Sequence, residues 1–402
     1  MIVRQFISWV RTAPAGERAD ATRALAQAWL VSDLSEDDSA AAEGALLMLL
    51  DDPSPLVRQA MAEVFTWSDH APAAIVRALS CDQPSVALPI LEFSPLLIDA
   101  DLVDIVATGS VDVQSAIARR MHLPASVCAA IAEVGSASAV LELIENPYSE
   151  ILPLSLDRIV ERFGHLAAIR ETLLSQDDLP AATRLVLVGK LSETLAQFVT
   201  ARSWLSADRA GRITAEACER STVNIAAQSS GDDLGGLLRH LRATGQLTSG
   251  LILRALLSGN FEMFADALVE LSGLPAARVY ALVQERGGSG VTALLQRAGL
   301  PASTFPAFRA ALAARNEIGF SATVDGTVRL SRRMVERVLT SCEMSADIAQ
   351  PLLILLRRFA TESAREEARL FCDDLVADEY HDTASDSDFT DADFADTDAA
   401  AA

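Results

Sequence analysis

The sequence predicts an all-α protein, built as a repeat solenoid of helical hairpins, then a second helical block and a disordered acidic C-terminal tail. Apolar residues recur at helical spacing through most of the 402-residue chain, and we find no convincing alternating strand. Similar turn motifs return every 26 to 29 residues, which is typical of repeat architectures. Aromatic residues make up only 5% of a chain that is 50% hydrophobic, so aliphatic side chains are expected to fill the core.

The first two helices are predicted from their amphipathic patterns. They cover residues 16–32 and 36–50. Ser35, with Asp38 three residues later, resembles a capping box at the start of the second helix.

The next segment, LLDDPSPLVRQAMAEVF at 49–65, predicts a helix, a tight turn and another helix. Its aspartates and Ser54 favour a turn, and Pro55 suits the first turn of a helix because proline lacks an N–H. One buried helix face is expected from Val57, Ala60, Met61, Val64 and Phe65.

Repetition follows this segment. A stretch at 82–95 resembles it with Val86 in the place of Val57, and a stretch at 109–121 continues the series with Val113. The repeats predict a stack of hairpins in which neighbours complete each other's core.

A proline shared by two repeats is a further expectation. The segments at 82–95 and 146–160 align at an offset of 64 residues, which matches Pro89 with Pro153. We expect both prolines about four residues inside a helix, in equivalent repeats, where each removes one hydrogen bond and bends its helix.

Leu-Pro-Ala motifs predict further helix starts, because proline suits the first helical turn. They occur at residues 123–125, 179–181, 274–276 and 300–302. Gly273 and Gly299 precede the last two, and each is expected to end the helix before it.

The chain divides by these patterns into a helical repeat domain at 1–205, a second helical domain at 206–320, C-terminal helices at 321–377 and a tail at 378–402. Residues 321–330 fit either a small hairpin or a simple interhelical turn. The tail has nine carboxylates and no lysine or arginine, so it carries −9 of the chain's net charge of −22. It has too few apolar residues for their burial to offset the entropy lost on ordering, and it is therefore expected to be disordered.

The turn at Asp52 followed by Val57-Arg58 resembles a HEAT-repeat unit, although later repeats lack the arginine. Residues 1–320 more closely resemble an uncharacterised alphaproteobacterial family of the domain-of-unknown-function type. LLDDPSPLVRQAMAE, SPLLIDADLVDIVATGS and QSAIARR carry that resemblance. It implies degenerate HEAT-like helical repeats and a bacterial cytoplasmic setting, and no catalytic residues.

No residue is predicted to be catalytic, to bind a cofactor or to ligate a metal. His70 and His122 precede helix starts as surface residues, and the five scattered cysteines have no zinc-site spacing with the histidines. The glycine-rich segment 285–295 lacks the lysine of a phosphate-binding loop and is expected to join two helices. The N-terminus lacks a signal-peptide pattern and no run of about 18 apolar residues occurs, so a cytoplasmic location is expected.

These features favour a non-enzymatic scaffold or adaptor that binds a protein partner on its curved surface. One alternative is a HEAT-like nucleic-acid-binding or repair factor, which the acidic charge disfavours, and another is a small-molecule sensor with a pocket between the helical blocks. Candidate partner-binding residues are Phe389 and Phe394 in the tail and the doublet Arg119-Arg120. The tail either docks onto a partner or only keeps the protein soluble. Basic doublets in so acidic a chain are otherwise expected on solvated helix faces or beside local carboxylates.

Overall fold

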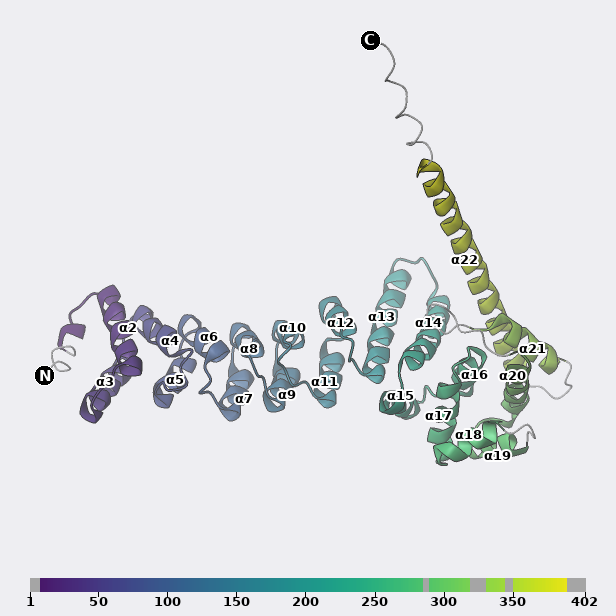
Figure 1. Ribbon diagram of the computed structural model, residues 1–402, viewed down its shortest axis with the longest axis horizontal. Coiled ribbons are helices and arrows are strands. Elements are labelled where there is room, and N and C mark those ends of the chain that lie inside the picture. The colour runs from purple at the N-terminus through teal and green to yellow at the C-terminus, as the bar shows by residue number, and fades with distance from the viewer. Residues whose placement is uncertain (1–7, 285–288, 319–329, 344–349, 389–402) are drawn as a thin grey trace, which may run out of the picture. The chain divides into compact units, whose positions relative to one another are not determined.

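The computed structural model describes the chain in four stretches: residues 8–284, 289–318, 330–343 and 350–388. Side chains are described in these stretches except for Ile318 and those beyond Asp373. The described elements are helices and one isolated β-bridge, so the prediction of an all-α protein is confirmed (Figure 1).

Contacts between residues divide the chain into two units. The N-terminal unit comprises residues 1–179 with 189–195, and the C-terminal unit comprises 180–188 with 196–402. The division falls within helix α13 (Ala181–Ala201), whereas the sequence placed the domain boundary after residue 205.

Helices of the N-terminal unit pack in two rows. One row contains the even-numbered helices, each packed on the next, and the other contains odd-numbered helices, in which α9 packs on both α7 and α11. The even row is α2 (Ala15–Val31), α4 (Pro55–Phe65), α6 (Pro84–Phe93), α8 (Val111–Ala118), α10 (Ala137–Glu145) and α12 (Ala167–Leu174). The remaining helices are α3 (Glu36–Leu49), α5 (Ala73–Ser80), α7 (Asp99–Thr108), α9 (Ala125–Val134) and α11 (Pro153–Phe163).

Local signals placed the early elements correctly. The Ser35 side chain accepts a hydrogen bond from the backbone N–H of Asp38 and caps α3. The Asp52 carboxylate accepts the backbone N–H of Ser54 at 2.8 Å, which forms the turn before Pro55 starts α4. Four residues of the predicted stripe in α4 are fully buried, and Val64 is partly buried.

The expectation that Pro89 and Pro153 are equivalent is wrong. Pro89 lies inside α6, in the even row, but Pro153 is the first residue of α11, in the other row. Three residues separate α5 from α6, whereas residues 146–152 form a seven-residue connection before α11. In the segment 82–95 the helix begins five residues before the matched proline, whereas in 146–160 it begins at the proline itself. Pro153 therefore removes no helical hydrogen bond.

Three of the Leu-Pro-Ala motifs lead directly into helices α9, α13 and α18 (Ala276–Gln284), and the fourth leads into a 3₁₀ turn, η1 (Ala302–Thr304), before α20 (Phe305–Ile318). Gly273 and Gly299 have φ angles of 66° and 73°, the left-handed conformation in which glycine ends helices at no steric cost. Both glycines therefore serve the predicted purpose.

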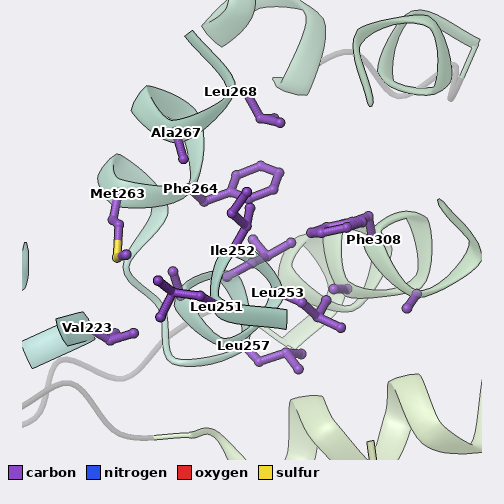
Figure 2. Close-up of a cluster of buried hydrophobic side chains, with 14 of the residues drawn as sticks. Val223, Leu251, Ile252, Leu253, Leu257, Met263, Phe264, Ala267, Leu268 and Phe308 are labelled. Atoms are coloured by element: carbon purple, nitrogen blue, oxygen red, sulfur yellow. The ribbon is translucent and has the colours of Figure 1, made fainter. Parts of the chain in front are cut away.

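The C-terminal unit is built around α16 (Ser249–Leu257). Residues 251–257 of this helix are all buried, and they contact apolar side chains from α14, α17 and α20 (Figure 2). Phe264 and Phe308 lie beside them with ring centroids 6.0 Å apart. The other helices are α14 (Ala207–Gln228), α15 (Gly231–Ala243), α17 (Phe261–Ser272), α19 (Ser289–Arg297), α21 (Arg332–Glu343) and α22 (Gln350–Asp388).

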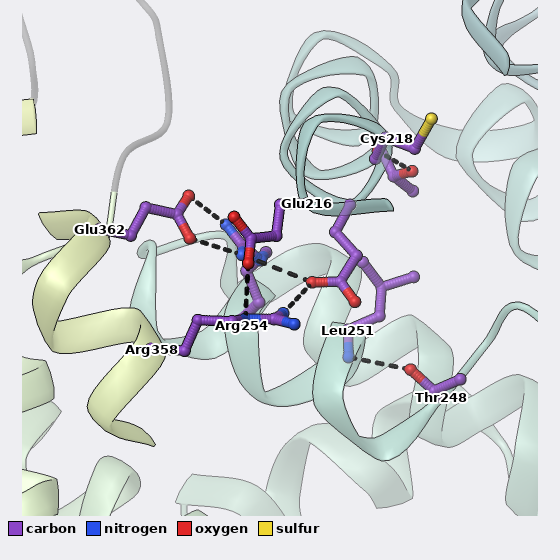
Figure 3. A network of polar contacts seen from close by, with 9 residues as sticks. Glu216, Cys218, Thr248, Leu251, Arg254, Arg358 and Glu362 are labelled. Carbon is purple, nitrogen blue, oxygen red and sulfur yellow. Dashed lines mark hydrogen bonds and ion pairs between the residues drawn. The ribbon is translucent and has the colours of Figure 1, made fainter. Parts of the chain in front are cut away.

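One buried cation interrupts the apolar surface of α16. Arg254 is 1% exposed, and its guanidinium donates two 2.7 Å hydrogen bonds to the carboxylate of Glu362 on α22. Glu219 on α14 lies 3.4 Å from Arg254 and accepts a 2.6 Å hydrogen bond from Arg358 (Figure 3). The network joins α14, α16 and α22. Its buried cation, Arg254, lies beside two carboxylates, which offset the cost of burying the charge.

The C-terminal helix extends further than the sequence suggested. α22 continues to Asp388, eleven residues into the segment 378–402 that was expected to be disordered. Each residue added to an existing helix gains one backbone hydrogen bond, which a composition argument does not count. Phe389 and Phe394 lie outside the described residues, as do residues 285–288 of the glycine-rich segment and nearly all of 321–330.

Candidate protein-binding edge

The candidate site lies in the N-terminal unit, where the C-terminal ends of neighbouring even-row helices are bound to one another. Arg120, just after α8, donates hydrogen bonds to the backbone carbonyls of Leu91 and Ser94 at the end of α6. Asn146, just after α10, donates two 2.8 Å hydrogen bonds to the carbonyls of Ala118 and Arg120. Carbonyls at helix ends lack partners inside the helix, so each repeat satisfies the end of the one before it.

Arg120 is consequently a structural residue. Its side chain is buried, with the residue only 7% exposed, and burial lowers the pKa of its guanidinium. A buried guanidinium bound to two carbonyls is not presented to a partner, so the structure corrects the expectation that Arg120 is a binding residue.

Arg119 points into solvent and forms two ion pairs. Its guanidinium lies 3.1 Å from Glu92 on α6 and 3.3 Å from Glu142 on α10. The hydrogen bond to Glu92, assisted by the charge of Glu142, raises the pKa of Arg119. The side chain thus bridges three neighbouring helices on the surface, close to the ends that Arg120 and Asn146 join.

The loops that follow α8 and α10 are also held together. The backbone N–H of Leu123 donates to the carbonyl of Tyr148 at 3.1 Å, and the N–H of Glu150 donates to the carbonyl of Leu123 at 3.0 Å. This pairing forms a parallel bridge between Leu123 and Ser149. It fixes the ring of His122 beside that of Tyr148, with centroids 6.0 Å apart.

Exposed apolar and aromatic side chains follow these joined helix ends. Trp67 is 68% exposed, Met121 60%, Tyr148 53% and Phe93 39%. The rings of Trp67 and Phe93 stack at 4.3 Å between centroids, which fixes both in place. We call the row formed by Trp67, Phe93, Met121, His122 and Tyr148 the aromatic edge.

The aromatic edge has the properties of a protein-binding surface. Contiguous exposed apolar side chains mark interaction sites, and tryptophan and tyrosine are enriched among the residues that dominate binding energy. Their stacking and loop pairing also reduce the entropy that a partner must remove on binding.

The surroundings of the aromatic edge are acidic. Residues 1–179 have 26 carboxylates and 11 arginines, a net charge of −15, whereas residues 180–377 have a net charge of +2. Asp69 and Glu150, in loops at the edge, and Glu145, the last residue of α10, are exposed. This field favours a basic partner and disfavours a phosphate backbone.

Two other basic doublets, Arg332-Arg333 and Arg357-Arg358, include arginines that lie beside carboxylates, as expected for an acidic chain. Arg332 pairs with Glu336 and Glu367, each at 2.8 Å. Arg357 lies 2.8 Å from Glu343, and Arg358 belongs to the network around Arg254. None of these pairs concentrates positive charge for a nucleic acid.

No catalytic arrangement emerges from the described residues. The His70 side chain is exposed, and its Nδ1 lies 3.5 Å from the carboxylate of the neighbouring Asp69. Burial raises the pKa of the Cys128 thiol to about 11, which makes it a poor nucleophile. In the stretches that the structure describes, no three or more His, Cys, Asp or Glu side chains are grouped to hold a metal ion. None of the helices in the described stretches is long and apolar enough to cross a membrane.

The aromatic edge was missed at the level of sequence, although a signal exists. Trp67, Phe93, Met121 and Tyr148 are separated by 26, 28 and 27 residues, which is the spacing of the repeats. These residues lie off the buried helix stripes, so a search for amphipathic faces passes over them.

Fold and surface together define an all-helical protein whose N-terminal unit presents a row of aromatic side chains and has no evident catalytic centre among its described residues. The chain belongs to the family DUF2336, described as an uncharacterised protein conserved in bacteria, whose match covers residues 86–346. No curated protein and no solved structure matches the chain. The predicted membership in a bacterial family of this type is thereby confirmed.

Proposed function

We propose that this protein is a non-enzymatic cytoplasmic adaptor that binds a protein partner along the aromatic edge. The row of exposed aromatic side chains carries the proposal. A soluble surface rarely keeps large apolar side chains in register over four repeats unless they are covered in use. Burial of each would contribute about 1.5–3 kcal/mol, which is enough for a few residues to anchor a complex.

The charge around the edge indicates the kind of partner. Arginine or lysine side chains on the partner would meet Asp69, Glu145 and Glu150 at the rim, where they would speed association. HEAT-like repeats, which the sequence predicts, would suit this use, because stacked helices offer an extended binding surface. Nucleic-acid binding and small-molecule sensing remain predictions, because no observation on the described residues favours either.

The test compares an edge variant with a matched control. The edge variant combines Trp67→Ala with Tyr148→Ala, and the control combines Leu56→Ala with Val111→Ala. Leu56 and Val111 are 56% and 52% exposed at the N-terminal ends of α4 and α8, away from the edge. Immobilised wild-type and variant chains are incubated with lysate of the source bacterium, and captured proteins are quantified by mass spectrometry.

We expect a protein that the wild type and the control capture equally and the edge variant captures at least tenfold less. The interaction is then measured with purified proteins. Circular dichroism and melting must be unchanged in both variants, since exposed side chains contribute little to the core. Equal capture by all three chains, or equal loss in both variants, would refute the proposal.

A further inference from the structure

A second surface lies on the hairpin formed by α13 and α14, far along the chain from the aromatic edge. These helices have 21 and 22 residues, a length of about 32 Å each at 1.5 Å per residue. The chain reverses at Ser203, which has φ of 56°, and the Trp204 N–H donates to the carbonyl of Val199 at 3.0 Å. We call residues 196–213, at this turn, the hairpin tip.

Nothing in the described part of the chain covers the hairpin tip. Ala210 is the only buried residue between 196 and 213, although Phe198, Trp204 and Ile213 are large apolar residues, each 46% to 63% exposed. Two helices alone cannot bury the apolar stripes of both, so a face of this kind is completed by another segment.

An aromatic cluster at the hairpin tip is already ordered. Phe198 and Trp204 meet edge to face with centroids 5.7 Å apart. The guanidinium of Arg202 lies over both rings, 4.4 Å from the centroid of Phe198 and 5.5 Å from that of Trp204. Cation–π contacts hold all three side chains in place, and these residue types often anchor interfaces.

Beside the cluster is a hollow of about 410 Å³ between the two helices. Most of the side chains that line the hollow are small, and a Cβ atom added at Gly211 would meet no atom within 4 Å. The hollow is therefore large and open enough to receive an aromatic side chain. Its lining includes Ala196, Thr200, Ala201, Ala207, Ala210 and Gly211.

Charge distinguishes the hairpin tip from the rest of the chain. It contains Arg202, Arg209 and Arg212 and one carboxylate, Asp208, a net charge of +2 in a chain of −22. The hairpin tip is a basic and apolar surface, and its complement is an acidic segment with aromatic residues.

The chain itself contains such a segment. Residues 389–398, FTDADFADTD, have four aspartates, two phenylalanines and no basic residue. They follow α22, which the Arg254 network binds to α14, the second helix of the hairpin. Fourteen residues follow Asp388, a reach of up to about 46 Å when extended. Figure 1 shows α22 running toward the same side of the C-terminal unit as the start of α14.

We propose that the acidic C-terminal segment 389–398 binds the hairpin tip, with a phenylalanine in the hollow and aspartates beside Arg209 and Arg212. The N-terminal unit, at −15, repels this segment, whereas the hairpin tip attracts it and offers a site for an aromatic ring. The bound segment covers an apolar face that the described helices leave exposed.

The test uses a labelled peptide of residues 387–402 and a chain truncated after Asp388, with binding followed by fluorescence anisotropy. Saturable binding is expected, at least tenfold weaker for a peptide with Phe389→Ser and Phe394→Ser. Gly211→Leu places a side chain at the hollow, starting from a Cβ position with no atom within 4 Å, and raises helix propensity, so the variant is expected to fold, as circular dichroism checks, and to lose binding at least tenfold. Arg209→Glu with Arg212→Glu is expected to do the same.

The control for charge is Arg239→Glu with Arg278→Glu, which reverses two exposed arginines elsewhere in the C-terminal unit and leaves binding within twofold. In the full chain, hydrogen exchange at 196–213 is expected to be slower than in the truncated chain, independently of protein concentration. Absence of peptide binding, equal binding by all variants, or protection that rises with concentration would overturn the proposal.

Discussion

The adjacent residues Arg119 and Arg120 are expected to respond very differently to the same substitution. Arg119→Ala removes two exposed ion pairs, with Glu92 and Glu142. Arg120→Ala removes a buried guanidinium that binds the carbonyls of Leu91 and Ser94. The two variants have the same change of charge and size, so each is the control for the other.

The magnitudes follow from burial. An exposed ion pair contributes about 0.2–1 kcal/mol, so the loss of two pairs in Arg119→Ala should cost about 0.4–2 kcal/mol, toward the lower end because both are exposed. A hydrogen bond from a charged group contributes about 1.5–3 kcal/mol, and Arg120 makes two. The substitution also removes the desolvation cost of burying the guanidinium, whose Nε has no hydrogen-bond partner, and this gain offsets part of the loss. We expect a net loss of about 2–4 kcal/mol in the free energy of unfolding of the N-terminal unit.

Urea unfolding of the full chain, followed by circular dichroism, measures both losses, and hydrogen exchange assigns them to a unit. In the Arg120→Ala variant, amides at the ends of α6 and α8 should lose protection, while those of the C-terminal unit keep it. A difference between the two variants below about 0.5 kcal/mol, the usual range of surface substitutions, would refute the assignment of Arg120 as the residue that joins these helices.

Two further predictions concern charges that the fold has buried or paired. Glu362→Gln should destabilise the C-terminal unit by about 3–5 kcal/mol, because Arg254 loses its bidentate partner; the readout is urea unfolding, and a loss below about 1 kcal/mol contradicts it. Burial acts to raise the pKa of Asp52, but hydrogen bonds from Arg18 and Ser54 outweigh it and lower that pKa. The stability from this lowered pKa is fully present above the unfolded value of about 3.9 and is lost as pH falls through the folded value. Urea unfolding between pH 7 and 2 should show this loss in the wild type and a smaller one in Asp52→Asn; equal slopes would contradict it.

The sequence was sufficient for features that depend on residues a few positions apart. The Ser35 cap, the turn at Asp52 and the helix ends at Gly273 and Gly299 each involve groups within four residues. Local hydrogen bonds and steric limits decide such features wherever the segment lies in the fold. The all-α class follows, because the same short-range periodicity recurs along most of the chain.

Pro153 marks the limit of that reasoning. Its alignment with Pro89 assumed that equal spacing means equal position, but the connection between α10 and α11 is longer than that between α5 and α6. The loop pairing between Leu123 and Ser149 accompanies the longer connection, and it joins residues 26 positions apart. Only tertiary structure determines how long such a connection must be.

Tertiary structure alone also decided which charged and aromatic residues are available for binding. Arg119 and Arg120 are identical in sequence terms, yet one points into solvent and the other into the end of α6, because α8 stops at Ala118. Arg254 meets Glu362 across 108 residues, and no local pattern specifies that pair. Trp67 stacks on Phe93 because α4 packs on α6, and His122 lies beside Tyr148 because the loops after α8 and α10 pair with each other. The sequence by itself determined where helices form and end, and long-range packing determined which side chains those helices leave exposed.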